Sequence, residues 1–344
     1  TSAAAPIVML HGFGGGLGIY FRNYAPLAEA TPQRVIYSVD WIGMGLSSRS
    51  ETLPTSKGEV VAQTEDFFID ALERWRLTMG IPQMYLMAHS FGAYMAALYA
   101  NRYPHRVERL VLLSPMGVSP TPPGYDAWVR EILQGNFNCP LPRWAFKRPT
   151  APKLPAGFRL VPLDNDPEAR LHLPGAPESF LGSLRLHGPF FYHIWRWNLS
   201  PQWFVRATGP LGPTLITRFS THRHHSADLA QQRYLEYIYH LAAQPASGEY
   251  AYTALLTPYA FARAPLTPHR LAAVTSPVTI VYGEHDWINH GGAEELIQHL
   301  PTGSRVTYLP GARHSSMVEQ PDQFNAFMRE ELTLTAKSES SPRP

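Results

Sequence analysis

The sequence has 344 residues, of which 44% are apolar and 16% are charged, and its formal net charge is +2. This balance is typical of a globular protein, and the length allows one large domain with an insertion or two domains. The small net charge and the lack of a long Lys/Arg run argue against a nucleic-acid partner. Because no stretch of about 18 apolar residues occurs, we expect no transmembrane span.

The single cysteine, Cys139, excludes an internal disulfide framework and a multi-cysteine zinc site, and it fits a reducing compartment. We interpret Cys139 as structural. The chain begins T-S-A-A-A-P without an initiator methionine, so we expect further residues upstream. We therefore make no prediction about a targeting presequence.

Short β-rich apolar runs alternate with helical patterns over the first 116 residues and again after residue 276. Such alternation predicts an α/β fold, a mainly parallel sheet flanked by helices. The predicted strands are 6–12, 34–40, 84–89, 107–115, 276–283 and 304–310, and the predicted helices are 56–79, 91–104, 291–300 and 321–334.

The intervening residues 117–270 are rich in proline, tryptophan and tyrosine and carry few strand signals. A compact domain rarely tolerates so long a structureless span, which favours an inserted, mostly helical cap over an irregular linker. We therefore expect core residues 1–116, a cap or lid at 117–270, further core at 271–334 and a disordered tail at 335–344.

Ser90 lies in "AHSFG" (88–92), between a predicted strand and a predicted helix. The stretch resembles the turn G-x-S-x-G, which presents a nucleophilic serine and needs small residues two positions before and after it. Ala88 and Gly92 meet that need, and the large His89 and Phe91 are allowed at the adjacent positions. The alternative is a serine that merely caps the following helix.

A glycine-rich stretch, "HGFGGG" (11–16), directly follows the first predicted strand. Ester cleavage creates an oxyanion that needs preorganised backbone N–H donors. The residue after the serine, Phe91, and the loop residue Phe13 are the predicted donors, with His11, Gly12 and Gly14 shaping the loop. Phosphate binding is the alternative, but no P-loop or dinucleotide-binding pattern is present.

A serine nucleophile needs a base and an orienting acid. Asp286 follows the strand 276–283, and His314 follows the strand 304–310. The order Ser90, Asp286, His314, each after a separate strand, is the order expected of an α/β-hydrolase. The strand ends of such a sheet share one edge, so we expect these side chains to meet there.

Other residues compete for these roles. Glu284 and Glu319 could replace Asp286, although the turn position favours Asp286. Asp40 follows the second strand, and we expect it to shape that turn. The histidine-rich "THRHH" (221–225) has no accompanying carboxylate spacing, so we predict no metal site and no cofactor.

With these motifs in place, nearly the whole chain resembles the α/β-hydrolase branch of ABHD4/ABHD5-type lipid enzymes and their fungal and plant relatives. The likeness covers the glycine loop, the serine turn and the acid segment "YGEHDWINHGG", and is most branch-specific in the cap segment "LSPQWFVRATGPLGPTLITRFSTHR". The branch includes fungal mitochondrial cardiolipin-specific deacylases and lysophospholipid acyl enzymes.

The chain departs from this family at several points. Ala88 replaces the first glycine of the serine turn, and the family's H-x4-D signature stands here as H-x4-E, from His314 to Glu319. The family also begins with two more strands before the glycine loop, and these are absent from this chain. Vertebrate ABHD5 relatives carry asparagine at the nucleophile position and act as co-activators, whereas this chain keeps Ser90.

The segment 188–206 interleaves aromatic residues with Arg196 and Arg206. Such side chains suit the headgroup level of a bilayer, with the arginines available for phosphate, although the aromatics could simply pack the cap onto the core. We therefore expect a lipid substrate at a membrane or lipid-droplet surface, with no nucleic acid as partner. The resemblance implies an intracellular, peripheral membrane location, with the mitochondrion favoured.

The sequence thus predicts a serine hydrolase that cleaves acyl esters of membrane phospholipids in the manner of a cardiolipin or phospholipid deacylase. Acyl transfer to a lysophospholipid by the same residues is one alternative, and a non-catalytic co-activator of another lipase is a second. Epoxide hydrolases and dehalogenases would need aspartate at position 90. The headgroup, the acyl position and the oligomeric state do not follow from the sequence.

Overall fold

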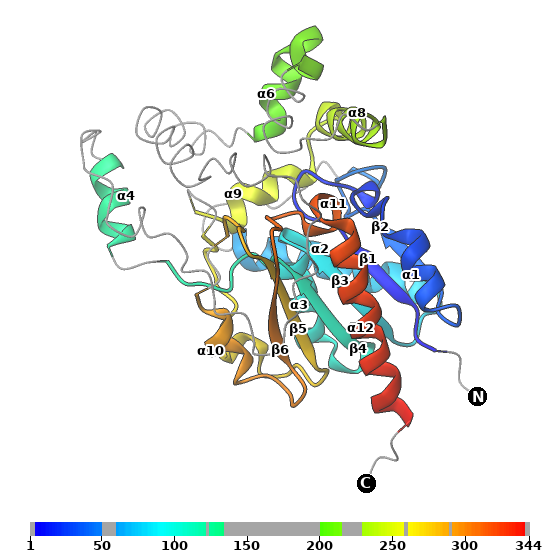
Figure 1. Ribbon diagram of the computed structural model, residues 1–344. Helices are drawn as coiled ribbons and strands as arrows, with labels where there is room; N and C mark the ends of the chain where they lie inside the picture. Colours follow the sequence, from blue (N-terminus) through cyan, green and yellow to red (C-terminus); the bar gives the residue numbers. More distant parts are fainter. Residues whose placement is uncertain are drawn as a thin grey trace.

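The protein is built around one parallel sheet, shown in the computed structural model of Figure 1. The structure describes residues 4–49, 60–121, 124–133, 200–214, 229–257, 261–288 and 291–340. The sheet order is β2-β1-β3-β4-β5-β6, and every neighbouring pair is parallel. The strands are β1 (Ile7–Leu10), β2 (Ile36–Val39), β3 (Met84–His89), β4 (Val107–Leu113), β5 (Val278–Gly283) and β6 (Arg305–Leu309).

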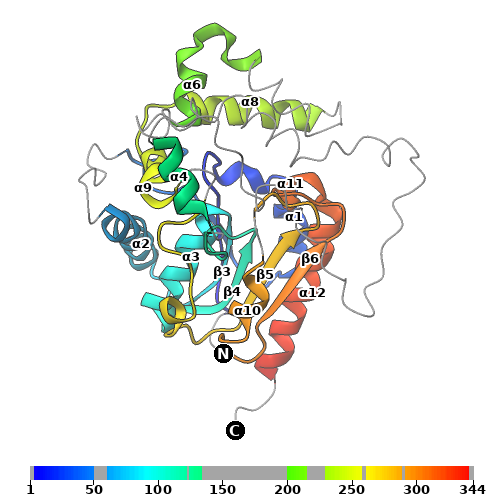
Figure 2. The same ribbon diagram turned by 90° about the vertical axis from the view of Figure 1, so that its left-hand side faces the viewer.

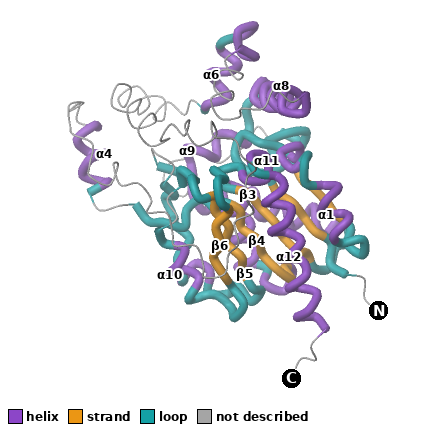
Figure 3. The backbone as a smooth tube through the Cα atoms, viewed as in Figure 1, coloured by secondary structure: helices purple, strands orange, loops and turns teal. Residues whose placement is uncertain are grey.

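Helices cover both faces of the sheet, as the tube in Figure 3 makes visible. In Figure 2, α2 and α3 lie on one side of the strands and α12 lies on the other. The core helices are α1 (Tyr24–Ala30), α2 (Val60–Thr78), α3 (Phe91–Arg102), α10 (Ala293–Ile297), α11 (Ser316–Glu319) and α12 (Pro321–Ser340), with 3₁₀ helices η1 (Leu17–Tyr20), η2 (Pro104–Arg106) and η7 (His269–Leu271).

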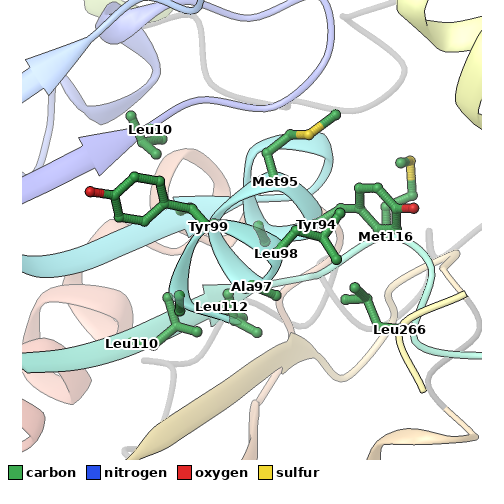
Figure 4. Close-up of a cluster of buried hydrophobic side chains, with 14 of the residues drawn as sticks. Leu10, Tyr94, Met95, Ala97, Leu98, Tyr99, Leu110, Leu112, Met116 and Leu266 are labelled. Atoms are coloured by element: carbon green, nitrogen blue, oxygen red, sulfur yellow. The ribbon is translucent and has the colours of Figure 1, made fainter. Parts of the chain in front are cut away.

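The strands bury side chains on both faces because the layers of helices exclude water from each. In β1, Val8 and Leu10 belong to the cluster beneath α2 and α3, whereas Ile7 and Met9 belong to the cluster beneath α1 and α12. Figure 4 shows part of the first cluster, where Ala97 of α3 lies beside Leu112 of β4 and the Tyr99 ring extends toward Leu10 of β1. These continuous apolar strands are the signature of a parallel sheet buried on both sides.

A buried polar contact fixes α12 against the sheet. Glu331 of this helix accepts hydrogen bonds from Arg109 of β4 at 2.7 Å and from Thr279 of β5 at 2.7 Å. Arg305 of β6 pairs with its second oxygen at 2.5 Å. Because the carboxylate is fully buried, these partners compensate the removal of its charge from water.

The six predicted strands are all present, with ends that differ by at most two residues. Helix α12 differs from expectation because it continues through Ser340. Residues 335–340 are therefore helical, contrary to the predicted disordered tail, and 341–344 lie outside the described residues. Helix α1, which contacts α12, and the 3₁₀ helix η1, which contacts α11 and α8, were not predicted from the sequence.

Within 117–270, the described residues form helices and a single isolated bridge, Leu256 to Ala262. Helices α6 and α8 lie above the end of the sheet that carries α11 (Figures 1 and 2). Leu255 and Leu266 instead belong to the main core cluster. The helices of this span are α4 (Tyr125–Leu133), α6 (Pro201–Ala207), η4 (Gly209–Leu211), α8 (Leu229–Ala243), η5 (Gly248–Tyr250) and α9 (Ala251–Leu255).

Candidate active site

Ser90 occupies a sharp turn between β3 and α3, with backbone angles φ 53° and ψ −114°. A side chain with a Cβ rarely adopts positive φ, so the surrounding structure must hold the residue there. The Ser90 N–H donates to the Leu113 carbonyl at 2.8 Å, and the Ser90 carbonyl accepts from Tyr94 N–H at 3.1 Å. The Ser90 side chain makes no hydrogen bond that caps α3, which disfavours the helix-cap alternative.

The backbone around Ser90 is packed too closely to accommodate larger side chains at positions 12, 88 and 92. Ala88 is fully buried, and a Cβ added at Gly92 would lie 2.3 Å from the His11 carbonyl oxygen. A Cβ at Gly12 would lie 3.0 Å from the Ser90 Cβ. The glycine-rich loop therefore touches the serine turn directly, which the spacing along the chain could not reveal.

The side chains of Ser90, His314 and Asp286 form a hydrogen-bonded chain. The distance from His314 Nε2 to Ser90 Oγ is 3.0 Å, and the distance from His314 Nδ1 to Asp286 Oδ1 is also 3.0 Å. The Asp286 side chain is inaccessible to solvent, whereas that of His314 is 17% exposed. The three residues follow β3, β5 and β6, so one edge of the sheet brings them together.

Asp286 keeps its charge in this buried position. Burial alone would raise the pKa of its carboxyl, but His314, Ser114 and the Ile288 N–H together hold that pKa below its usual value. The Ile288 N–H lies 3.0 Å from Asp286 Oδ1. A carboxylate ionised in this way can stabilise a positive charge on His314.

The two alternative acids, Glu284 and Glu319, bind backbone N–H groups. Glu284 accepts the Gly311 N–H at 2.8 Å, and Glu319 accepts the Arg313 N–H at 2.7 Å. Both carboxylates thus hold the backbone of the loop that carries His314. Of the three candidate acids, Asp286 is the one hydrogen-bonded to the His314 ring.

Gly283 explains how the acid loop and the histidine loop approach each other. A Cβ at Gly283 would lie 2.1 Å from the Arg313 carbonyl oxygen, so no larger residue fits. The two loops are joined by hydrogen bonds from Glu284 N–H to Leu309 at 2.9 Å and from His285 N–H to Ala312 at 2.9 Å. Sequence reasoning placed Gly283 only as the end of a strand.

His89 supports the histidine loop from the serine side. Its Nε2–H donates to the His314 carbonyl oxygen at 2.9 Å, and the two rings lie 4.8 Å apart. Burial, with a smaller contribution from His314, lowers the pKa of His89 to about 3, so this imidazole is neutral at ordinary pH. The centroid of the Trp287 ring lies 4.9 Å from that of His314. Neither contact was predicted, since both depend on loops that are distant in sequence.

The glycine-rich loop is anchored through His11, which is fully buried. Its Nδ1–H donates to the Gly12 carbonyl at 2.8 Å, and its Nε2 accepts the Trp41 N–H at 3.0 Å, which defines a neutral ring. Burial lowers the pKa of His11 accordingly. Gly14 has φ 69°, which favours glycine, and the Phe13 ring lies 4.6 Å from that of Tyr252.

Asp40 shapes its turn, as predicted: its carboxylate accepts the Leu17 N–H at 2.6 Å and the Leu46 N–H at 2.9 Å. Arg206 differs from expectation because its guanidinium pairs with Glu249 at 2.5 Å and is not free for a phosphate. Within the described part of the chain, no group of His, Cys, Asp and Glu could hold a metal ion. Cys139, Arg196 and 221–225 lie outside the described residues.

The profile of the alpha/beta hydrolase fold matches residues 5–321. Since this is most of the chain, the protein belongs to the α/β-hydrolase family, and its similarity to curated relatives assigns it to the ABHD4/ABHD5-like branch. The human (lyso)-N-acylphosphatidylethanolamine lipase is 30% identical over 94% of this chain and 78% of its own length. The pig 1-acylglycerol-3-phosphate O-acyltransferase ABHD5 is 30% identical over 94% of this chain and 76% of its own.

A probable 1-acylglycerol-3-phosphate O-acyltransferase of rice is 29% identical over 94% of this chain, which spans 66% of the rice protein. Among solved structures, a bacterial membrane phospholipase A has a TM-score of 0.56 at 18% identity, covering 98% of this chain and 81% of its own. Proline iminopeptidase of Mycobacterium smegmatis has a TM-score of 0.55 at 19% identity, covering 99% and 93%. At such identities the structural likeness establishes the fold alone.

Across the described residues, no helix combines the length and apolar character that crossing a bilayer requires.

Proposed function

We propose that the protein is a serine hydrolase that cleaves acyl ester bonds of phospholipids through an acyl-enzyme on Ser90. The observation that carries this proposal is the hydrogen-bonded chain from Ser90 through His314 to Asp286, set on a turn with positive φ. A serine hydroxyl becomes nucleophilic when an adjacent base accepts its proton, and the base works best when a carboxylate orients it.

In the proposed reaction, Ser90 Oγ attacks the ester carbonyl carbon while its proton passes to His314 Nε2. The negative charge that develops on the carbonyl oxygen is bound by the N–H groups of Phe91 and Phe13. Phe91 is the first residue of α3, whose N–H groups have no acceptor one turn back within the helix. The ester C–O bond then breaks, and His314 returns the proton to the leaving alcohol.

Water completes the cycle by the same route. His314 takes a proton from water as the water oxygen attacks the acyl-enzyme, and Ser90 leaves with that proton while the fatty acid is released. Asp286 remains ionised throughout and stabilises the positive form of His314, consistent with the lowered pKa of its carboxyl. No cofactor or metal enters this sequence of steps.

The phospholipid substrate class is supported by the relatives, which are named as a lipase of N-acylphosphatidylethanolamine and as acyltransferases of acylglycerol phosphate. Half-exposed Trp203 and Trp287 would suit an amphipathic surface near lipid. Cardiolipin as the particular lipid, a membrane or lipid-droplet surface as the place of reaction and a mitochondrial location stay parts of this proposal.

Acyl transfer is the second candidate, because two of the named relatives are acyltransferases. It needs only that a lysophospholipid hydroxyl replaces water in the second half of the reaction. The H-x4-E stretch lends this candidate little support, since Glu319 binds the backbone of the histidine loop. A non-catalytic co-activator is the third reading, and Ser90 with its hydrogen-bonded partners disfavours it.

A fluorophosphonate probe tests the catalytic role of Ser90. We expect the wild type to be labelled and Ser90→Ala to remain unlabelled, and equal labelling of both would exclude Ser90 as the nucleophile. Lipidomics of total membrane lipids mixed with each protein then identifies the substrate. Fatty acid release indicates hydrolysis, new acyl chains on lysophospholipids indicate transfer, and a change confined to neutral lipids would contradict the proposed substrate class.

A further inference from the structure

A pocket lies beside the glycine-rich loop. It is an open hollow, and the space of about 340 Å³ along its lining includes open solvent. Phe13, Gly14 and Gly15 form one wall, and Arg49 and Gln202 form others. Gly12 abuts Ser90, and the next three residues of the same loop line this pocket.

Arg49 is the basic side chain of this pocket, and its guanidinium is held entirely by backbone carbonyls. Nε donates to Pro245 at 3.0 Å, Nη1 donates to Ser47 at 3.3 Å, and Nη2 donates to Gly45 at 2.9 Å. Among the described residues, no carboxylate is paired with it. A guanidinium has five N–H donors. These three bonds therefore leave about two N–H groups for a ligand.

Among the described residues, Glu249 is the carboxylate that lines the pocket, and it does not neutralise Arg49. Glu249 accepts from the Ser200 hydroxyl and forms a two-pronged ion pair with Arg206, at 2.9 and 2.5 Å. Its charge is thus balanced within the cap. The pocket is left with the positive charge of Arg49, on a planar group suited to two oxygens of one anion.

Gln202 is a second side chain of the pocket with an unused hydrogen-bonding group. Gln202, on α6, lines the pocket and is only 9% exposed, yet its Oε1 accepts no hydrogen bond from the described residues. Buried amides are almost always hydrogen-bonded in the functional state. A hydroxyl group entering the pocket would supply the missing donor, and the other end of the amide could donate to the same ligand.

We propose that this pocket binds the phosphate-bearing headgroup of the lipid substrate, with Arg49 on the phosphate and Gln202 on a glycerol hydroxyl. Arg49 is thereby the residue that makes the enzyme prefer phosphate esters over neutral glycerides. This inference rests on the proposed function of Ser90. In this proposal Arg49 takes the phosphate-binding role that the sequence suggested for Arg206, because the Arg206 guanidinium is paired with Glu249.

The sharpest test compares two substrates that differ only by the phosphate, oleoyl lysophosphatidate and monooleoylglycerol, in micelles of a non-ionic detergent. The measured quantity is the ratio of their kcat/KM values for fatty acid release. We expect Arg49→Gln to lower this ratio about ten- to a hundredfold, as for the loss of hydrogen bonds to a charged group. Arg49→Lys keeps the charge without the planar fork, and we expect it to give an intermediate ratio.

Arg106→Gln is the matched control. Arg106 also donates to a backbone carbonyl, that of Pro82, but it lies in η2 just before β4, at the edge of the sheet opposite to Ser90. We expect the ratio to stay at the wild-type value. An unchanged ratio in both Arg49 variants, with thermal unfolding showing that they are folded, would overturn the inference. If Arg49→Gln does not fold, Arg49→Lys carries the test.

Two further measurements separate the possible failures. Titration of Ser90→Ala protein with each lipid reports headgroup binding without turnover, and we expect Arg49→Gln to abolish its preference for lysophosphatidate. Were wild type to hydrolyse neither lipid while this preference persisted, the proposed function alone would fail. Inhibition by inorganic phosphate that depends on Arg49, with an unchanged substrate ratio, would assign the pocket to free phosphate and contradict the headgroup role.

Discussion

At the turn after β3, Ser90 is held by the backbone: positive φ, hydrogen bonds to its own peptide groups, and neighbours too close for larger side chains. At the loop after β6, His314 is held by side chains: Glu319 and Glu284 bind the loop backbone, and His89 binds its carbonyl. The first region should therefore be the more sensitive to added side-chain volume, and the second, apart from its close contact with Gly283, the more sensitive to the loss of polar groups.

The largest effect on kcat is expected at Asp286, the acid that is hydrogen-bonded to His314. Asp286→Asn preserves the shape of the acid but removes the charge that stabilises positive His314, so we expect kcat to fall by about 10⁴-fold. Steady-state hydrolysis of a soluble ester measures this. Glu284→Gln is the matched control, because that residue binds the Gly311 N–H, which an amide oxygen can still accept. A comparable loss in both variants would contradict the assignment of Asp286.

Gly92→Ala tests the steric side of the comparison. The new Cβ would lie 2.3 Å from the His11 carbonyl, so the glycine-rich loop must move away from Ser90. Displacing the Phe13 N–H removes a proposed oxyanion donor, and such a loss lowers kcat by about 10²–10³-fold. Activity and thermal unfolding are measured together. A folded Gly92→Ala protein with wild-type activity would show that the loop does not need this contact.

Ala88 offers a smaller and graded test of the same turn. Because this side chain is fully buried, Ala88→Val overfills the site, and we expect a loss of about 1–3 kcal/mol in the free energy of unfolding. Ala88→Gly restores the common form of the turn, and we expect it to keep activity at a stability cost of about 0.5–1 kcal/mol. Denaturant unfolding distinguishes the two. Equal destabilisation would mean that volume is not what limits this position.

The smallest effect concerns Glu319 and its pH dependence. Burial raises the pKa of this carboxyl above its usual value, partly offset by the hydrogen bond from Arg313. Wild-type stability therefore falls as pH rises from the ordinary glutamate range through the raised pKa, because the buried group must ionise. Glu319→Gln keeps an acceptor for Arg313 without that charge.

We expect the melting temperature of Glu319→Gln, relative to wild type, to rise between about pH 4 and about pH 8. Thermal unfolding at both values measures the difference. A constant difference across this range would indicate that Glu319 ionises normally. A large loss of activity would instead show that the negative charge itself acts on His314.

Much of the fold was predictable because a strand buried on both faces must be continuously apolar. "MYLMAH" and the apolar end of "VERLVLL" follow this pattern, and both are central strands. The chain order of Ser90, Asp286 and His314 was equally readable, since parallel strands end at one edge. Helix α1 was missed because its packing against α12, nearly the whole chain away, stabilises a segment without a strong helical pattern.

The sequence by itself determined the parallel sheet, the serine turn with its small neighbours, and the residues that meet at the strand ends. These follow from local rules of burial, backbone strain and strand direction. Only the tertiary structure decided that Asp286 and not Glu284 or Glu319 is hydrogen-bonded to the His314 ring, and that Arg206 is paired with Glu249 whereas Arg49 is held by backbone carbonyls beside the glycine-rich loop. Such pairings depend on distances between loops far apart in the chain, which no local pattern encodes.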